Sequence, residues 1–478
     1  MKTPIKNILL ALFALSTIFS CKKYLNVQPE DKVLEGALFS NKQGINSALN
    51  GLYISLTNKN LYGENLTLST VDILAQRYNI ASSHDLYKAA TYAYADKPIV
   101  EKIDAMWTGA YTGILNVNEF LNNLDKYPNV IDGKTDSIYR GEALGIRAML
   151  HFDMLRLFGP RYSTADSLKA SIPYYSTTKS SINELLPANK AIVMVINDLA
   201  AAEQMLKNDP VIKNGTMIPA IGDPANFLTS SRNYRMNYYA IKALQARVHL
   251  YRGDKVSALA AAKLLIQNAD KFKWTTSNNA LNEKTDPDRV FTTEMILGVQ
   301  NSDLYNRYDA LFNPSLADNV ILAPLASRLA TVFETNENDF RYNLNWTVPS
   351  NGGKTYRTFY KYADVVNKDK VNFRFTIPLV KISEMYYIAA ECEPDATTAV
   401  GYLNTVRVNR GLLNLASTVN INTELQKEYQ KEFFGEGQLF YYYKRKNITS
   451  IPNGMATSGT VVMGAVLPLP LSESQYRP

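Results

Sequence analysis

The chain has 478 residues, a formal net charge of +7, and 46% apolar residues. This mild basic excess, without any run of five or six like charges, argues against nucleic acid as a partner. The length allows one large domain or two to three ordinary ones, but no long Gly/Ser-rich or Pro-rich linker divides the chain. We therefore expect a single domain over residues 21–478, preceded by a signal peptide at residues 1–20.

The first 21 residues have the pattern of a secretory signal that ends on a cysteine. Lys2 and Lys6 form a short cationic start, and an almost wholly apolar run, Ile8–Phe19, follows them. This run is shorter than the roughly 20 residues that a membrane-spanning helix needs. Ser20 followed by Cys21 resembles a bacterial lipobox, in which the cysteine is acylated and becomes the first mature residue. The sequence predicts lipidation of Cys21 and stable anchoring by two or three acyl chains; the alternative is an ordinary cleaved signal peptide.

Helical periodicity dominates the strongest patterns in the mature chain. Tyr139–Phe158 carries two apolar stripes, which indicates a helix buried between neighbours, and Gly159-Pro160 ends it. Ala191–Leu206 is a second amphipathic helix, with one apolar face.

Met236–Asn268 has the pattern of a helical hairpin. Two apolar periodic segments flank Arg252-Gly253-Asp254, and Ala246 and Ala258 lie on either side of this turn. Small residues where backbones approach closely, in a unit of about 34 residues, are typical of a tetratricopeptide hairpin. The alternative is an ordinary helical hairpin.

A second hairpin is predicted from Ile382–Glu391 and Ala396–Asn409, with Pro394-Asp395 as its turn. Such units stack to bury their apolar faces. The predicted fold class is mostly α: tetratricopeptide-like hairpins form a scaffold that carries long loop-rich insertions and a few short strands, such as Met295–Val299 and Arg357–Tyr360. Long insertions on a rigid scaffold are usually functional, and they are expected at residues 160–188, 207–234, 270–300, 302–325 and 340–375.

The sequence contains little that points to catalysis. No HExxH, GxSxG, CxxC or GxGxxG motif occurs, and Gly352-Gly353-Lys354-Thr355 lacks the first glycine of a phosphate-binding loop because Val348 stands there. If Cys21 carries lipid, Cys392 is the single free thiol, and its setting predicts a core residue. A glycosidase carboxylate pair stays open, since acidic residues are plentiful. An enzyme is the weaker hypothesis, and no cofactor is predicted.

An ordered series of short motifs extends along the whole mature chain. From the N-terminus they are Cys21-Lys-Lys-Tyr-Leu-Asn-Val-Gln-Pro29, Phe39-Ser40, Ala48-Leu-Asn-Gly-Leu-Tyr53, Trp107-x3-Tyr111-x2-Ile114-x3-Asn118, Glu142-Ala-x3-Arg147-Ala-x3-Phe152, Leu157-Phe-Gly159, Asn197-Asp-Leu199, Ala246-Arg-Val-x-Leu-Tyr251, Leu403-Asn-x-Val-Arg407-x2-Arg410-Gly411, Glu432-Phe-x2-Glu436-Gly437 and Leu467-Pro-Leu-Pro470. In this order the set resembles the SusD/RagB family of outer-membrane nutrient-uptake lipoproteins of Bacteroidetes.

The resemblance implies a helical scaffold with a loop-rich ligand region, a lipid anchor in the outer membrane facing the exterior, and no catalysis. It further implies that the protein binds oligosaccharides and delivers them to a partner, a TonB-dependent β-barrel transporter (SusC-like). Some branches of the family bind peptides instead. Two features depart from the family pattern: Lys22-Lys23 follow the predicted lipidated cysteine, and Gln438 and Tyr441–Tyr443 replace residues that are often Arg and Asp.

Three classes of function follow from these observations. The preferred one is glycan binding for uptake; the alternatives are a peptide-binding member of the same family and a helical-repeat scaffold lipoprotein without a small ligand. Asn, Asp and aromatic residues mixed in the insertions favour glycan.

Aromatic side chains beside polar ones, outside the periodic helices, are the candidate ligand contacts. Tyr and Trp supply flat stacking faces at low conformational cost. The predicted ligand-binding residues are Asp72, Arg77 and Tyr78; Tyr305, Asn306 and Tyr308, with Arg307 between them; and Trp346, flanked by Asn343 and Asn345.

Overall fold

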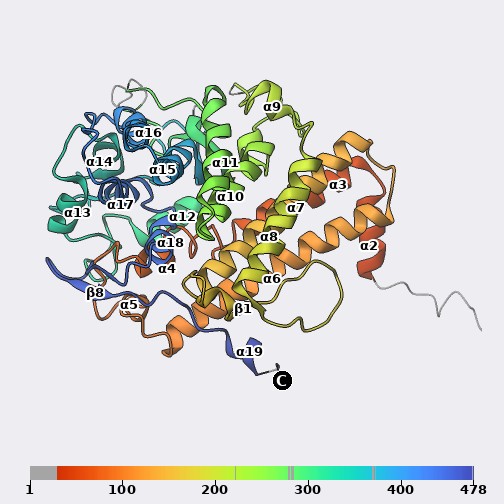
Figure 1. The fold of residues 1–478 in the computed structure, drawn as a ribbon, viewed down its shortest axis with the longest axis horizontal. Coiled ribbons are helices and arrows are strands. Elements are labelled where there is room, and N and C mark those ends of the chain that lie inside the picture. The colour runs from red at the N-terminus through yellow and green to blue at the C-terminus, as the bar shows by residue number, and fades with distance from the viewer. Residues whose placement is uncertain are drawn as a thin grey trace, which may run out of the picture.

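The computed structural model describes residues 30–475 and 477, apart from 221, 278–279, 281–284, 369–370 and 372. The predicted signal peptide and Cys21 lie outside the described residues. Helices form most of the regular structure and the strands are short, as predicted (Figure 1).

Long helices build most of the N-terminal part of the chain, in the centre and at the right of Figure 1. They are α2 (Glu30–Phe39), α3 (Lys42–Leu56), α6 (Lys97–Lys126), α7 (Gly133–Phe158) and α8 (Ala188–Met205). Two short helices between α3 and α6, α4 (Thr70–Leu74) and α5 (Tyr87–Ala90), lie at the lower left of the figure. The two strands between α7 and α8 are β1 (Ala170–Ile172) and β2 (Leu186–Pro187), which pair antiparallel.

Shorter helices and long connections build the C-terminal part. The helices are α9 (Pro210–Asn214), α10 (Tyr238–Tyr251), α11 (Lys255–Gln267), α12 (Leu304–Leu311), α13 (Ala326–Phe333), α14 (Phe340–Asn345), α15 (Ile382–Cys392), α16 (Ala396–Val408), α17 (Ile421–Glu432), α18 (Gln438–Arg445) and α19 (Leu471–Ser474). The strands are β3 (Met295–Gln300), β4 (Trp346–Thr347), β5 (Thr358–Phe359), β6 (Thr376–Lys381), β7 (Ser450–Pro452) and β8 (Thr460–Val462). They form antiparallel pairs β3–β6, β4–β5 and β7–β8.

Helix α7 is the central helix that its two apolar stripes predict. It packs against α6 and α8 and is buried along almost its whole length. Asp132 caps its first turn by accepting a hydrogen bond from the backbone N–H of Thr135 at 3.0 Å. At its other end the buried amino group of Lys444 donates to the carbonyls of residues 156, 157 and 159, over 2.6–3.1 Å. These hydrogen bonds satisfy carbonyls that the helix leaves unpaired.

Both predicted helical hairpins are confirmed. Helices α10 and α11 pack together and enclose the turn at Gly253, whose φ of +86° suits glycine. Asp254 then caps α11 through the N–H of Ser257. Helices α15 and α16 form the second hairpin, and α11 packs against α15, so the two units stack side by side.

The long insertions contain more regular structure than the sequence predicts. Residues 302–325 were expected as irregular chain but include α12, and residues 340–375 include α14. Helices of this length are marginal in isolation and depend on packing, which explains why periodicity does not find them. The predicted strand at Met295–Val299 is confirmed as β3; its partner is β6, which is buried along its whole length and leads directly into α15.

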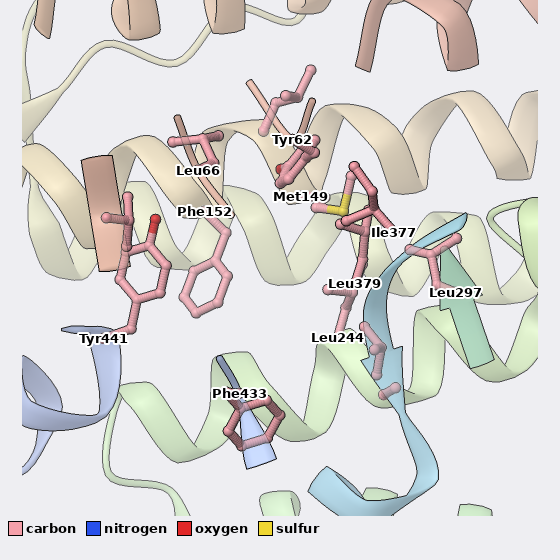
Figure 2. Packing of buried hydrophobic residues seen from close by; sticks show 14 of the residues in the cluster. Tyr62, Leu66, Met149, Phe152, Leu244, Leu297, Ile377, Leu379, Phe433 and Tyr441 are labelled. Atoms are coloured by element: carbon pink, nitrogen blue, oxygen red, sulfur yellow. The ribbon is translucent and has the colours of Figure 1, made fainter. Parts of the chain in front are cut away.

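The buried apolar side chains form one continuous cluster that reaches from Phe39 to Leu467, with a small second cluster around Phe291. Figure 2 shows its centre, where α7, α10, the β3–β6 pair and α18 contribute side chains. Many of the 31 tyrosines belong to this core. Buried Tyr62, for example, donates its hydroxyl hydrogen to Asp153 at 2.6 Å, as a buried tyrosine hydroxyl requires.

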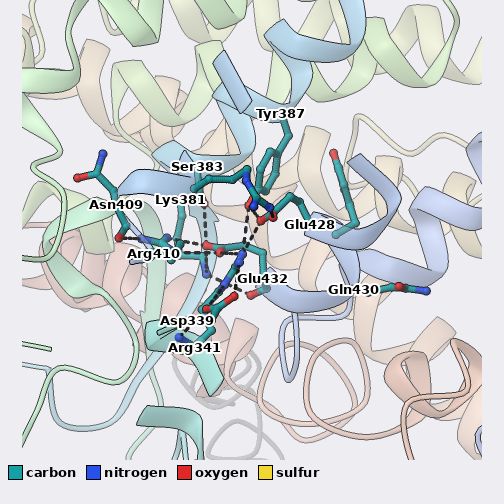
Figure 3. A network of polar contacts seen from close by, with 12 residues as sticks. Asp339, Arg341, Lys381, Ser383, Tyr387, Asn409, Arg410, Glu428, Gln430 and Glu432 are labelled. Atoms are coloured by element: carbon teal, nitrogen blue, oxygen red, sulfur yellow. Dashed lines mark hydrogen bonds and ion pairs between the residues drawn. The ribbon is translucent and has the colours of Figure 1, made fainter. Parts of the chain in front are cut away.

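A buried network of ion pairs joins the C-terminal helices (Figure 3). Glu432, at the end of α17, accepts from Arg410 at 2.8 Å and from Arg341 at 3.1 Å, and Lys381 lies 2.9 Å away. Burial raises the pKa of Glu432, but Arg410 and Lys381 outweigh this effect and hold the pKa well below its usual value. Glu432 is therefore an anion in the interior.

The ion pairs continue from Glu432 through Arg410 to Glu294 and through Lys381 to Glu436. The network contains five carboxylates and five cations, so its formal charges balance. The carboxylates are Glu294, Asp339, Glu428, Glu432 and Glu436, and the cations are Arg341, Lys361, Lys381, Arg407 and Arg410.

We predict that Arg410→Met destabilises the protein strongly. The substitution leaves Glu294 and Glu432 without their shared cation, and an unpaired buried charge costs about 3–5 kcal/mol. Urea unfolding would measure the loss of free energy. Lys427→Met is the matched control, because Lys427 pairs with Glu334 near the surface, where a pair contributes at most about 1 kcal/mol. Equal effects of the two substitutions would contradict the prediction.

We also predict that Ala246→Leu overpacks the scaffold. Ala246 is fully buried on α10, and added methylenes in a close-packed interior cost about 1–3 kcal/mol. Ala260→Leu on exposed α11 surface should change stability by less than about 0.5 kcal/mol. Thermal unfolding of both variants measures the two effects. An unchanged melting temperature for Ala246→Leu would show that the hairpin is not closely packed at Ala246.

Candidate ligand-binding surface

Asp72 and Tyr78, two predicted ligand contacts, lie in the interior. Asp72 is 0% exposed, and its Oδ2 accepts a hydrogen bond from the N–H of Gly435 at 2.7 Å. Burial raises the pKa of Asp72 to about 6, although Arg77 and this hydrogen bond act in the opposite direction. Tyr78 is 1% exposed and directs its hydroxyl toward Asp72. In this conformation neither side chain can touch a ligand; they hold the turn at Gly435 against α4.

Trp346 is also a structural residue in this conformation. It is 1% exposed, and its ring packs against Phe359 and Phe434 with centroid separations of 5.0 and 4.8 Å. Its neighbour Asn345 is buried, whereas Asn343 is exposed and donates to the carbonyl of Glu337. The structure therefore does not support stacking of a ligand on Trp346.

Tyr305 lies where a ligand could reach it. It belongs to α12 rather than to an irregular loop, and it is half-buried. Its ring packs against Phe375 with centroids 4.9 Å apart, and its hydroxyl accepts the backbone N–H of Phe375 at 3.1 Å. Phe375 is itself half-buried, so the two rings form a partly open aromatic surface.

A charged pair borders these rings. The guanidinium of Arg374 lies 4.5 Å from the centroid of Phe375 and 5.4 Å from that of Tyr305. Asp364 accepts from Arg374 at 3.2 and 3.3 Å. Both charged side chains are half-buried. A hydrogen-bonding donor and acceptor thus stand beside two flat apolar faces.

A second tyrosine–arginine contact lies near the first, since Arg289 interacts electrostatically with both Tyr360 and Tyr305. Arg289 is buried, lies 4.6 Å from the ring centroid of half-buried Tyr360, and donates to the carbonyl of Ala363 at 2.6 Å. Burial lowers the pKa of Arg289. The Nε of Arg289 and the hydroxyl of Tyr308 are buried polar groups without a hydrogen-bond partner among the described residues. Tyr308, one turn after Tyr305, is therefore mainly internal.

We name Tyr305, Tyr360, Asp364, Arg374 and Phe375 the aromatic ledge. Chemically, the ledge offers apolar ring faces together with a guanidinium and a carboxylate. Such a combination suits a ligand that has apolar C–H faces and hydroxyl groups at its edges.

Asn306, another predicted ligand contact, and its neighbour Arg307 lie beside the ledge on α12. Asn306 is exposed and donates to Asp303 at 2.6 Å, while Arg307 pairs with Asp303 and with Glu64. Their side chains are accessible but already engaged in local hydrogen bonds. Helix α12 thus places Tyr305 and Asn306 at the surface, whereas Tyr308, Asp72, Tyr78 and Trp346 are buried.

Sequence reasoning did not single out Tyr360, Asp364, Arg374 and Phe375. The available signal was the alternation Phe373-Arg374-Phe375 immediately before an apolar strand. It could not be recognised as part of a site, because only the β3–β6 pairing brings this segment beside α12.

Within the described ranges, no group of three or more His, Cys, Asp and Glu side chains could hold a metal ion. In the same part of the chain, no helix combines the length and apolar character needed to cross a bilayer.

The chain is similar to proteins of one family. A SusD-like family model, described as starch-binding associating with outer membrane, matches residues 23–214. A SusD-like protein of Formosa agariphila is 23% identical over 265 residues, which are 54% of this chain and 45% of that protein. A second SusD-like protein of this organism is 21% identical over 460 residues, covering 84% of this chain and 81% of its own. The match thus spans less than half the length of the first relative.

Solved structures show the same fold. A SusD superfamily protein from Bacteroides thetaiotaomicron is 19% identical with a TM-score of 0.70, over 92% of this chain and 98% of that one. A laminarin-binding SusD-like protein is 17% identical with a TM-score of 0.65, over 91% and 98% of the two chains. The shared fold and the sequence matches agree with the ordered motifs of the mature chain. Over residues 23–214 the chain matches the SusD-like family model, and its fold is that of SusD superfamily proteins.

Proposed function

We propose that this protein is an outer-membrane lipoprotein that binds oligosaccharides on the aromatic ledge and passes them to a TonB-dependent transporter. The observation that carries the proposal is the ledge itself: half-open rings of Tyr305 and Phe375 next to the Arg374–Asp364 pair. A surface of this kind favours a small ligand over a purely protein-binding scaffold.

The chemistry of the ledge matches that of a sugar. The C–H face of a pyranose ring can stack on Tyr305 or Phe375, while its hydroxyls exchange hydrogen bonds with Arg374 and Asp364. Hydrogen bonds to charged groups contribute about 1.5–3 kcal/mol each when water is excluded, so several contacts together are needed for useful affinity. The carbohydrate-binding character of the SusD-like family, and the laminarin-binding relative in particular, support glycan as the ligand class.

The anchor and the partner complete the proposal. Cys21 is the residue that would carry lipid, as its lipobox-like context indicates. Acylation would hold the ledge at the membrane surface, where a β-barrel transporter could receive a ligand without its loss to the medium. Family membership supports this partner.

We expect the double substitution Tyr305→Ala, Arg374→Gln to weaken glycan binding at least tenfold. It removes one stacking face and one charged donor, and a tenfold change corresponds to only about 1.4 kcal/mol. Calorimetry with laminarin-type and starch-type oligosaccharides would measure the affinity. Tyr402→Ala is the matched control, since Tyr402 is a half-buried tyrosine on α16, outside the ledge. The proposal fails if the parent protein binds no glycan of the panel, or if the ledge variant binds as well as the parent.

We expect Cys21→Ala to release the protein from membranes, because an alanine cannot be acylated. Fractionation after high-salt and carbonate washing would detect the change. Cys392→Ala should leave the protein membrane-bound, since this second cysteine is a buried core residue. Retention of the Cys21→Ala variant in the washed membrane fraction would contradict lipid anchoring at this residue.

A further inference from the structure

A cavity of about 80 Å³ opens between the end of α4, helices α13 and α17, and the turn that follows β7. A single water needs roughly 10–15 Å³, so the space accepts a group of several heavy atoms. Its lining is mostly apolar, with two arginines. The lining residues used below are Arg77, Arg328, Leu329, Val332, Phe434 and Leu439.

Arg77 forms the inner polar wall of this cavity. It is 5% exposed, and its guanidinium carbon lies 3.8 Å from the ring centroid of Phe434. Its two terminal nitrogens donate to the carbonyls of Tyr429 and Gln430, but its Nε is buried and has no partner among the described residues. A buried donor without an acceptor is costly, so the site is incomplete as it stands.

Arg328 supplies a second guanidinium nearer the mouth. Its Nε donates to the carbonyl of Ala456 at 2.7 Å and one terminal nitrogen to that of Gly459 at 2.9 Å. The hydrogen bonds of both guanidinium groups go to backbone carbonyls, and none of the lining residues is acidic. Asp72 does not line the cavity; burial lowers the pKa of Arg77, and the nearby charge of Asp72 opposes this effect.

The lining therefore combines two cations that lack a direct anionic partner with walls of Leu329, Val332, Phe434 and Leu439. We propose that this cavity binds a small organic carboxylate with a branched apolar body. Its oxygens would accept from the Nε of Arg77 and from the guanidinium of Arg328, while its apolar part contacts the aliphatic walls. The carboxylate supplies the charge and the acceptor that the cavity lacks. This site is separate from the aromatic ledge and does not depend on glycan binding.

The test uses isobutyrate as the probe and isobutyramide as its neutral counterpart of nearly equal shape. Saturation-transfer NMR titration of the full mature protein should show isobutyrate binding at least tenfold more tightly than isobutyramide. Arg328→Gln should abolish this preference, because it removes the accessible charge while keeping a hydrogen-bonding side chain. Val332→Phe should reduce binding of both probes by filling the cavity, without any change of charge.

Two controls separate this inference from the proposed function. Tyr305→Ala should leave isobutyrate binding unchanged, and Arg328→Gln should leave glycan binding unchanged, because the two sites use different residues. Circular dichroism would establish that each variant is folded. Equal binding of isobutyrate and isobutyramide by the parent protein, or undiminished isobutyrate binding by both cavity variants, would overturn the inference.

Discussion

The carboxylate of Glu432 forms ion pairs with Arg341, Arg410 and Lys381, and all four side chains are buried. Desolvating so many charges is expensive, and the arrangement is stable only while each charge keeps its partners. Because these four residues come from α14, the end of β6, the turn after α16 and the end of α17, the network fixes these elements relative to one another. It thereby holds the irregular C-terminal segments together and attaches them to the helical hairpins.

The aromatic ledge depends on this network through its supporting segment. Lys361, next to Tyr360, is buried and pairs with Glu436, and Lys381 pairs with the same carboxylate. Phe375 directly precedes β6, the strand that ends at Lys381. The stretch 360–381, which carries every ledge residue except Tyr305, is therefore held near both ends by one glutamate. Gly437 follows this glutamate, and a side chain there would collide with the carbonyl of Leu66, 2.0 Å from its Cβ position. Rigid attachment of this kind lets partly open rings keep their positions before a ligand arrives.

The motifs that identify the family have structural roles in this molecule. Arg147 donates to both oxygens of Asp198 at 2.7 Å, which joins two motifs that are 51 positions apart, and Glu142 accepts from buried Arg232. Arg410 and Glu432 belong to two further motifs and form the centre of the buried network. Residues that hold the scaffold together thus belong to the motif series of this sequence, whereas the ledge residues lie outside the motifs. The motifs consequently indicate the fold but do not indicate which ligand is bound.

The sequence alone determined the helices and hairpins whose apolar periodicity extends over many residues, such as α7 and the α10–α11 pair, because local spacing sets which face is buried. It also indicated Tyr305 as a candidate contact. Tertiary structure decided the rest. Short α12 exists only through packing, Asp72 and Trp346 became internal, and Arg374 and Phe375 reached the ledge through pairing of β6 with β3. The exposure of a side chain and the partners of its polar atoms depend on residues that are distant in the sequence. A local sequence pattern carries no information about these contacts.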